Sequence, residues 1–326
     1  MPSSELEASP AKPATPGDTS WDAFGIPAGY HHGMLGEVLT AVCTPFKEDG
    51  SVDYDRFRDL AQHLVESGSD GLVVSGTTGE SPTLSDDEKF ELFSAAVDAV
   101  GDRATVIAGT GTYSTAHSVH LTARAHEVGV HGFLVVTPYY NKPPARGIVA
   151  HFRAIAEVSD RPIVVYNIPS RVVVNIEPET IAELAEIPTI TAVKQAHDDL
   201  DQARRIVETG LDLYAGDDNL VFPFLRLGGV GGICVHAHVV GPQVKQMVRA
   251  YKDGDEEVAR RIDHELEPIY ELLKITTNPI AIKAALNLLG HEVGGYRLPM
   301  VPPTDEELGR VRDCLERAGL RVPAAA

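Results

Sequence analysis

Eight short apolar runs alternate with amphipathic segments along most of this chain. Each run is too short for a buried helix, and most end in glycine, proline or a polar cluster, which is typical of buried strands. The runs are Val38–Val42, Leu72–Ser75, Thr105–Ala108, Phe133–Val136, Ile163–Tyr166, Ile190–Lys194, Leu213–Ala215 and Ile233–Val235. Strand–helix alternation repeated eight times predicts an α/β fold, a closed (β/α)₈ or TIM barrel.

An open doubly wound sheet is the alternative arrangement of alternating strands and helices. Such a sheet would carry a Gly-x-Gly-x-x-Gly turn after its first strand, whereas the first run here leads into Thr44-Pro45-Phe46. Helix-end signals fit the barrel. Ser85 and Glu88 have the spacing of a capping box, and glycines end the helical segments at Gly68, Gly101, Gly129, Gly210 and Gly254.

Composition divides the chain into three regions. Residues 1–33 are rich in Pro, Ala, Ser and Thr and predict a disordered leader, in which His31-His32 is interpreted as a solvated pair. Residues 34–254 hold the predicted barrel. Residues 255–326 predict a small C-terminal helical region beside it, because helical patterns continue there without strands at Glu256–Leu273, Pro279–Leu289 and Asp305–Ala318.

Charge and composition exclude several classes of function. The 326 residues include 28 Lys and Arg against 47 Asp and Glu, a net charge of −19, which argues against binding nucleic acid or an anionic membrane. No apolar run has the length of a membrane helix, and the N-terminus lacks a secretory signal pattern. The dispersed Cys43, Cys234 and Cys314 argue against a disulfide framework and predict a cytoplasmic location.

Lys194 is the first candidate for chemistry, because barrel enzymes place reactive groups at the carboxyl ends of their strands. It follows Ile190–Val193, so its stem is expected among barrel-core side chains. Desolvation disfavours the ammonium form, and lowering the lysine pKa by about three units would yield a neutral amine that attacks a carbonyl to form a Schiff base. The alternative is a strand-end lysine paired with a carboxylate.

Hydroxyl, amide and guanidinium groups are expected at the same mouth. Tyr166 ends the fifth run, where a buried phenol either relays protons or packs in the core. Thr77 and Thr78 lie in a glycine-flanked turn whose hydroxyls and amides suit a carboxylate. Arg171 either binds a second carboxylate or makes a surface salt bridge. Together these groups indicate a small oxoacid and an acidic co-substrate.

Five motifs, found in order, carry a family resemblance over about residues 34–320. The sequence resembles the dihydrodipicolinate synthases, Schiff-base barrels of the N-acetylneuraminate lyase superfamily. The resemblance implies a lyase that condenses pyruvate with L-aspartate 4-semialdehyde to 4-hydroxy-tetrahydrodipicolinate, in the diaminopimelate and lysine pathway. The motifs are Gly76-Thr77-Thr78-Gly79-Glu80-Ser81, Pro138-Tyr139-Tyr140-Asn141-Lys142-Pro143, Tyr166-Asn167-Ile168-Pro169-Ser170-Arg171, Val193-Lys194 and Gly216-Asp217-Asp218.

The resemblance implies the catalytic residues. Lys194 would form the imine with pyruvate, while Thr77 and Tyr166 would form a proton relay with Tyr140. In this family that last tyrosine reaches in from a neighbouring subunit. At least a dimer is therefore implied, and the family pattern is a homotetramer, a dimer of dimers.

The resemblance also implies the binding residues. Thr77 and Thr78 would bind the pyruvate carboxylate, and Arg171 would hold the carboxylate of the aldehyde substrate. Gly216 and Ile233 would belong to the substrate-binding residues as well. No metal or organic cofactor is implied, because the lysine imine is itself the electron sink.

Two stretches depart from the family pattern and bear on the co-substrate. Gln195-Ala196-His197-Asp198 stands where an acidic residue and Ala-Thr-Gly or Ala-Ser-Gly are more common, and Val172-Val173 replaces a hydroxyl residue and glycine. Both are expected near the aldehyde pocket, whereas Arg171 favours the synthase. Two other hypotheses stay open: another pyruvate-dependent aldolase, such as a sugar-acid or hydroxy-oxoglutarate lyase, and a non-catalytic barrel that binds oxoacids.

The resemblance extends to a lysine feedback site. Positions that carry histidine, asparagine and glutamate in lysine-sensitive relatives correspond to Lys89, Tyr113 and His117. An ammonium and an imidazole thus replace groups that would receive a cationic amino acid. The expected consequence is weak or absent inhibition by lysine.

His236-Ala237-His238, after the eighth run, has an alternative interpretation as part of a metal site. Two imidazoles on one face would suit a zinc-dependent aldolase, but no third ligand stands at a helpful spacing. Ordinary hydrogen-bonded histidines are therefore favoured.

Overall fold

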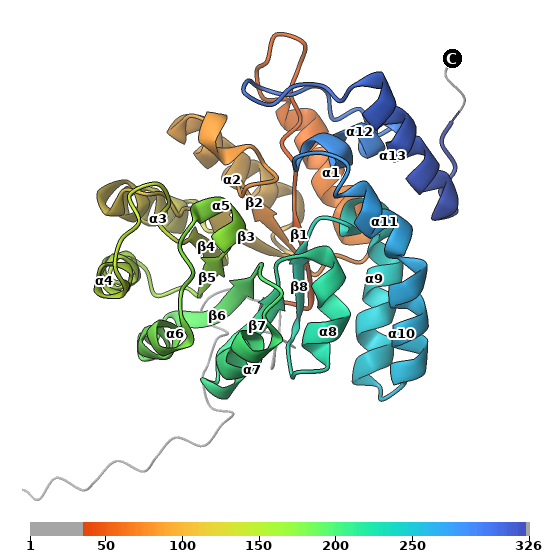
Figure 1. Cartoon of the computed structure of the whole chain (residues 1–326). Coiled ribbons are helices and arrows are strands. Elements are labelled where there is room, and N and C mark those ends of the chain that lie inside the picture. The colour runs from red at the N-terminus through yellow and green to blue at the C-terminus, as the bar shows by residue number, and fades with distance from the viewer. Residues whose placement is uncertain (1–34, 324–326) are drawn as a thin grey trace, which may run out of the picture.

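The computed structural model describes residues 35–323, which contain a closed barrel of eight parallel strands (Figure 1). The strands follow one another around the barrel in chain order, and β8 closes it by pairing with β1. The barrel confirms the expected α/β class, and all eight predicted strands are present. They span Val38–Ala41 (β1), Gly71–Val74 (β2), Thr105–Gly109 (β3), Gly132–Val136 (β4), Ile163–Asn167 (β5), Ile190–Gln195 (β6), Asp212–Ala215 (β7) and Gly231–Cys234 (β8).

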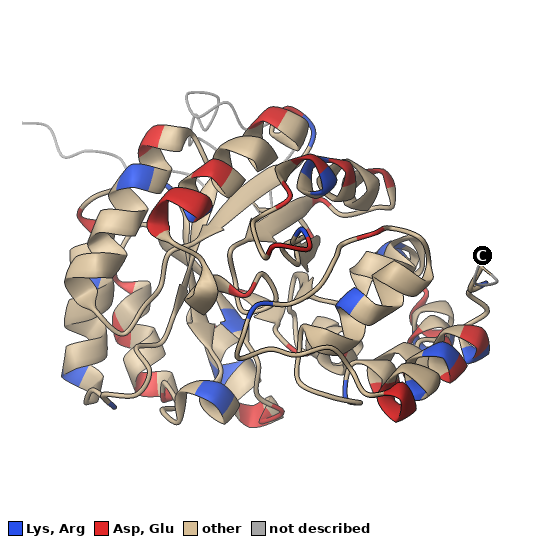
Figure 2. Cartoon of the chain, turned by 90° about the horizontal axis from the view of Figure 1, so that it is seen from above, with Lys and Arg blue, Asp and Glu red and all other residues tan. Residues whose placement is uncertain are grey.

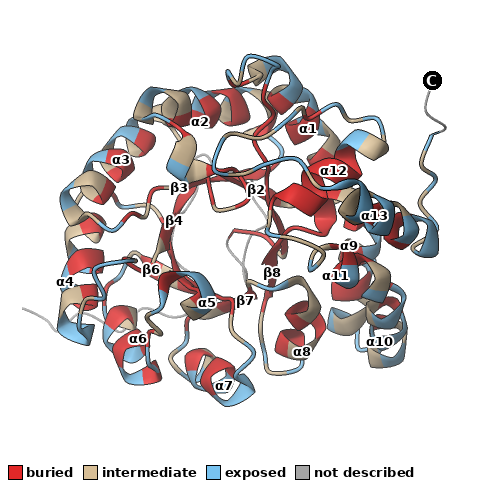
Figure 3. Cartoon of the chain, turned by 45° about the horizontal axis from the view of Figure 1, so that its top comes forward, coloured by how far each residue is buried: buried red, intermediate tan, exposed pale blue. Residues whose placement is uncertain are grey.

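Nearly every strand residue is buried, because one face of the sheet lines the barrel interior and the other packs against helices (Figure 3). Alternate residues such as Leu39, Ile107 and Tyr214 form the inner cluster. Their neighbours join a larger outer cluster between the sheet and the helices. Burial on both faces explains why the strands read as continuous apolar runs.

A layer of helices surrounds the sheet. The helices are α1 (Tyr54–Glu66), α2 (Asp86–Val100), α3 (Thr115–Val128), α4 (Ala145–Ala156), α5 (Pro169–Val172), α6 (Pro178–Ala185), α7 (Leu200–Glu208), α8 (Val221–Leu225) and α9 (Ala237–Lys252), with 3₁₀ turns η2 (Ser81–Thr83) and η3 (Asp218–Leu220).

Capping residues fix where these helices begin and end. The capping box predicted at Ser85 and Glu88 is present at the start of α2. Gly68, Gly129, Gly210 and Gly254 adopt the positive φ typical of glycine after a helix. Gly101 does not; it stays helical with a φ of −63°, and a side chain there would collide with the carbonyl oxygen of Val97.

The C-terminal region is helical, as expected, and lies beside α9 and α1 (Figure 1). Its helices are α10 (Glu256–Glu265), α11 (Glu267–Leu272), α12 (Ile280–Leu288) and α13 (Asp305–Arg317). The helical pattern over Glu256–Leu273 forms two helices that meet at Leu266. Pro268 lies in the first turn of α11, and its missing N–H cannot continue the bonding of α10.

The acidic excess is spread over the outer helices and interspersed with basic residues (Figure 2). No helix among residues 35–323 is long and apolar enough to cross a membrane. The predicted leader, including His31-His32, lies outside the described residues.

Candidate active site

A cavity of about 630 Å³ opens at the carboxyl ends of the strands. Its walls come from the loops after β2, β5, β6 and β7 and from the segment between α11 and α12. Of the predicted site residues, the cavity brings together Thr77, Thr78, Tyr166, Arg171, Lys194 and Gly216. Six residues from four separate segments of the sequence therefore share one solvent-accessible space.

Lys194 enters this cavity from β6 and is only 5% exposed. It stands in register with Tyr166 on one side and Tyr214 on the other, so two aromatic residues flank its stem. Its Nζ lies 4.2 Å from the centroid of the Tyr166 ring. Within the described residues Lys194 forms no ion pair, so the carboxylate-paired alternative is not what the structure contains.

Tyr166, at the end of β5, lies between two cavities. It is buried except for the part that faces these spaces, and it lines both of them. Its backbone oxygen accepts hydrogen bonds from the backbone N–H and the hydroxyl of Thr137, which fix the end of the strand. These bonds fix the Tyr166 backbone at the position from which its ring reaches the Lys194 amine.

The turn after β2 carries Thr77 and Thr78. Its backbone closes on itself, with the N–H groups of Gly79 and Ser81 donating to the Gly76 oxygen. The Thr78 hydroxyl accepts a hydrogen bond of 2.9 Å from Asn278 Nδ2, so a residue from the C-terminal region fixes its orientation. Both threonines line the cavity opposite the loop after β7.

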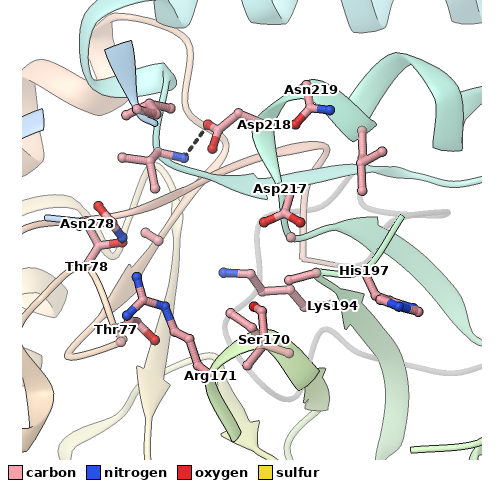
Figure 4. A pocket seen from close by; sticks show the side chains of 18 of the residues that line it. Thr77, Thr78, Ser170, Arg171, Lys194, His197, Asp217, Asp218, Asn219 and Asn278 are labelled. Atoms are coloured by element: carbon pink, nitrogen blue, oxygen red, sulfur yellow. Dashed lines mark hydrogen bonds between the residues drawn. The ribbon is translucent and has the colours of Figure 1, made fainter. Parts of the chain in front are cut away.

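Arg171 projects from α5 toward the same space. Figure 4 shows its guanidinium lying between Thr77 and the end of Lys194. The guanidinium forms no hydrogen bond or ion pair with residues 35–323, so the surface salt bridge considered from the sequence is absent. An unpaired guanidinium facing a cavity is suited to a carboxylate ligand.

The loop after β7 supplies a close approach and two carboxylates. A side chain at Gly216 would place its Cβ 2.7 Å from that of Ala196, so only glycine lets the loops after β6 and β7 meet here. Asp217 faces the cavity (Figure 4), whereas Asp218 accepts hydrogen bonds from the backbone N–H groups of Val235 and His236.

These neighbouring carboxyls have opposite pKa shifts. Partial enclosure raises the pKa of Asp217, the charge of Asp218 raises it further, and Lys194 opposes both. Burial would also raise the pKa of Asp218, but the adjacent His236 imidazole and the two backbone donors outweigh it and lower that pKa. The Asp218 carboxyl therefore ionises more readily than that of Asp217, and both residues line the cavity.

Two predicted residues lie elsewhere in this chain. Ile233 is fully buried in the inner cluster of the barrel and does not line the cavity. Tyr140 lies outside both cavities at the barrel mouth and is 91% exposed, with a positive φ of 69°. Within a single chain it contacts none of the other site residues by hydrogen bond or ring stacking.

The residues that depart from the family pattern near the expected aldehyde pocket do not all face the same space. His197 and Asp198 line the 630 Å³ cavity, but Gln195 is buried on the other face of β6, where its side-chain oxygen accepts from Asn167 Nδ2 at 3.0 Å. Val172 is buried on the wall of the second cavity and Val173 is exposed. Gln195 is thus not a cavity residue.

The two histidines after β8 have separate partners rather than one shared face. His238 Nε2 accepts from the Cys43 N–H at 3.2 Å, and its Nδ1 lies 2.8 Å from the Val235 oxygen. His236 Nδ1 lies 2.6 Å from Asp218 Oδ1, with Cys234 nearby. The Cys234 thiol donates to the Ala215 oxygen, and burial raises its pKa, which disfavours the thiolate that a metal would need.

A second cavity, of about 540 Å³, adjoins Thr77 and Tyr166 from the side of α2 and α3. Lys89, Tyr113 and His117, the three positions that the family resemblance assigned to a feedback site, line it. His117 Nε2 lies 3.0 Å from both oxygens of Asp86, and Lys89 Nζ lies 3.8 Å from the same carboxylate. Asp86, the carboxylate among the residues that line this cavity, therefore already interacts with the His117 imidazole and the Lys89 ammonium.

Sequence reasoning missed the cavity residues of the C-terminal region. Lys274, Thr276, Thr277 and Asn278 all line the 630 Å³ cavity from the segment between α11 and α12. The polar run before Pro279 identifies a loop, but nothing in it shows that the loop covers a barrel mouth.

Comparisons with known proteins agree with this geometry. A family model described as the dihydrodipicolinate synthetase family matches residues 34–318. The 4-hydroxy-tetrahydrodipicolinate synthases of Heliobacterium modesticaldum and Desulforamulus reducens are 49% and 48% identical over 289 and 290 residues, covering 88% of this chain in both cases and 96% and 98% of those proteins.

Solved structures give the same result. Dihydrodipicolinate synthase from Cyanidioschyzon merolae with lysine bound superposes with a TM-score of 0.87 and 44% identity, covering 89% of this chain and 100% of that one. The enzyme from Aquifex aeolicus gives a TM-score of 0.86 and 40% identity over 89% and 100%. A monomeric dihydrodipicolinate synthase variant gives 0.86 and 38% over 88% and 98%.

Proposed function

Because the chain belongs to the dihydrodipicolinate synthetase family, we propose that Lys194 is the amine through which it carries out the family reaction. That reaction is the condensation of pyruvate with L-aspartate 4-semialdehyde to 4-hydroxy-tetrahydrodipicolinate, in diaminopimelate and lysine biosynthesis. The observation that carries the assignment is a buried lysine without an ion pair, whose Nζ meets the Tyr166 ring at the barrel mouth.

Imine formation is the first step. The Lys194 nitrogen attacks C2 of pyruvate, the carbonyl oxygen takes up protons and leaves as water, and a protonated imine remains. Tyr166 borders Nζ and donates or accepts the protons that this exchange requires. Thr77 and Thr78 bind the pyruvate carboxylate, since both line the cavity on the turn after β2.

Carbon–carbon bond formation follows. Loss of a proton from C3 converts the imine to an enamine, and C3 attacks the aldehyde carbon, whose oxygen becomes the hydroxyl of the product. The amino group of the aldehyde substrate then attacks C2, closes the ring and releases the Lys194 amine. Arg171 holds the carboxylate of this second substrate, because its guanidinium enters the cavity without a protein partner.

Tyr140 completes the proton relay in a neighbouring subunit. Its 91% exposure and its strained positive φ fit a residue whose partners lie outside the chain. Tyr113, nearby on the same mouth, is also exposed, at 56%. The active unit is at least a dimer, and a homotetramer in which two such dimers associate is the proposed assembly.

A cytoplasmic location belongs to the same proposal. Cys43, Cys234 and Cys314 are all free and buried, which fits a reducing compartment. Other pyruvate-dependent aldolases and a non-catalytic oxoacid-binding barrel are the remaining hypotheses. The curated relatives favour the synthase over both.

Borohydride trapping tests the Lys194 assignment. Reduction in the presence of pyruvate should add one pyruvate less one oxygen atom to the mass of the protein, and peptide mapping should locate it at Lys194. Lys194→Ala should lose this adduct and at least ~10³-fold in rate, because the covalent route is removed. Lys274→Ala, which removes the other lysine of the cavity, should keep the adduct.

The aldehyde partner is tested separately. Initial rates with pyruvate and L-aspartate 4-semialdehyde are compared with rates of cleavage of sugar-acid and hydroxy-oxoglutarate substrates. Turnover only with the semialdehyde supports the synthase. An adduct at Lys194 combined with faster turnover of a sugar acid would identify another aldolase, and absence of any adduct would leave the binding barrel.

A further inference from the structure

A fully buried ion pair lies directly behind the turn that carries Thr77 and Thr78. Lys283 of α12 and Glu80, the residue before η2, are joined by an Nζ–Oε1 distance of 3.0 Å, with side chains 0% and 1% exposed. Lys283 Nζ also donates to the Thr44 backbone oxygen at 2.9 Å and lies 4.4 Å from the centroid of the Phe46 ring. Neither residue of the pair lines the 630 Å³ cavity or the 540 Å³ cavity.

The turn itself has an uncommon backbone. Ser75 and Glu80, which bracket it, both adopt positive φ, of 57° and 54°, in the left-handed region that residues with a side chain seldom occupy. Such conformations persist only where surrounding contacts fix them. The backbone N–H of Glu80 donates to the Thr77 oxygen at 3.2 Å, so the position of Glu80 and that of Thr77 are directly connected.

The Glu80 carboxylate is the point where three parts of the chain meet. Its Oε1 receives the Lys283 ammonium, and its Oε2 accepts the backbone N–H of Arg297 at 3.1 Å. Through Lys283 it is connected to Thr44 in the loop after β1, and the Thr44 hydroxyl donates to the Gly79 oxygen at 2.7 Å. The C-terminal region thus reaches the turn from behind, while Asn278 holds Thr78 from the cavity side.

Stability alone does not explain this arrangement. The free-energy cost of desolvating two charges offsets most of the gain from their attraction. Well-packed apolar residues therefore often replace a buried ion pair without loss of stability. Catalysis does require the turn to be held within a fraction of an ångström. We propose that Glu80 and Lys283 are positioning residues that fix the Thr77–Thr78 turn relative to Lys194 for the pyruvate carboxylate, an inference that rests on the proposed function of that turn.

The test removes both charges together, because a single change would leave the other charge buried. The double variant Glu80→Leu/Lys283→Met keeps the volume of the pair in apolar form. It should remain folded by circular dichroism, while kcat/KM for pyruvate falls by about 10²-fold, mainly through KM. Borohydride trapping at saturating pyruvate should still label Lys194, since the amine is unchanged.

A matched control pair lies at the opposite end of the barrel. Lys245 Nζ lies 2.6 Å from Asp70 Oδ2, and both side chains are largely buried. Lys245→Met/Asp70→Asn should leave the KM for pyruvate at the wild-type value. If the double variant does not fold, the isosteric Glu80→Gln, which removes one charge and one acceptor, should show the same rise in KM at smaller amplitude.

The outcomes separate this inference from the proposed function. A folded Glu80→Leu/Lys283→Met protein with wild-type KM and kcat would overturn the positioning role while leaving the reaction intact. An equal rise in KM in the Lys245→Met/Asp70→Asn protein would also overturn it, because the effect would then be general destabilisation. Failure of the wild-type protein to form the pyruvate adduct would instead contradict the proposed function.

Discussion

The guanidinium of Arg171 is the group that we propose binds the second substrate, because it enters the cavity without a partner in the described chain. We expect Arg171→Ala to lower kcat/KM for L-aspartate 4-semialdehyde by roughly 10- to 10²-fold, the value of one charge-assisted contact. Steady-state kinetics at saturating pyruvate measure this loss. Folding stability should not change, since no protein hydrogen bond is broken.

Pyruvate trapping provides the internal control for that variant. The Lys194 adduct should form in Arg171→Ala as in the wild type, because the guanidinium is assigned to the other substrate. Arg205→Ala, which removes an exposed arginine paired with Glu179, should leave kcat and the KM of both substrates unchanged. An unchanged KM for the semialdehyde in Arg171→Ala would contradict the assignment.

Charge in the second cavity predicts the response to lysine. A lysine ligand would bring its ammonium beside Lys89, and Asp86, the carboxylate on that wall, is already shared by Lys89 and His117. We expect no inhibition at micromolar lysine. Initial-rate measurements over a lysine titration check this, and inhibition in the micromolar range would refute it.

The reverse substitutions sharpen this experiment. Lys89→His/Tyr113→Asn/His117→Glu places the residues of lysine-sensitive relatives on the same cavity wall and replaces an ammonium by an imidazole and an imidazole by a carboxylate. The triple variant should become sensitive to lysine while its KM for pyruvate stays constant. A triple variant as insensitive as the wild type would show that other features exclude lysine.

Side-chain direction at the end of β6 limited what could be inferred from the sequence at the residue scale. The sequence places both Gln195 and His197 near the expected aldehyde pocket, yet only His197 lines the 630 Å³ cavity. Successive strand residues face opposite sides, so an inward Lys194 requires an outward Gln195. The outward direction of Gln195 could therefore be predicted from the sequence. Its hydrogen bond with Asn167 could not, because Asn167 lies on another strand.

At the scale of elements, the capping box at the N-terminus of α2 makes a contribution to stability that can be measured. The Ser85 hydroxyl accepts from the Glu88 N–H at 3.2 Å, and Glu88 Oε2 accepts from the Ser85 N–H at 2.9 Å. We expect Ser85→Ala to lower the free energy of unfolding by about 1 kcal/mol. Urea denaturation measures the change, and Ser85→Asp, which keeps a capping oxygen, should stay near the wild type.

Strands and caps were predictable because their signals are local. Each strand reads as a short apolar run, and Ser85 with Glu88 reads as a capping box. The split at Leu266 and the cavity loop ending in Asn278 were not, because they depend on where the C-terminal helices dock. Docking is set by contacts between positions about 200 residues apart, such as Asn278 with Thr78, and no local pattern encodes it.

At the scale of the whole molecule, the fold gathers all the proposed catalytic residues except Tyr140 into one cavity. That residue is exposed and contacts neither Lys194 nor Tyr166 in its own chain. The proposed site completed by a second copy would account for this exposure, whereas one structural relative is a monomeric dihydrodipicolinate synthase variant. Mixing variants of this chain distinguishes the two arrangements.

We expect chains with Lys194→Ala and chains with Tyr140→Ala, each nearly inactive, to recover activity when they are denatured and refolded together. In a mixed dimer, one site combines Lys194 of the second chain with Tyr140 of the first, so random pairing restores about a quarter of the wild-type rate. Mixing Lys194→Ala with Tyr166→Phe is the control and should restore nothing, because those two residues face each other within one chain. Rates no higher than the sum of the separate variants would place Tyr140 outside the neighbour's site.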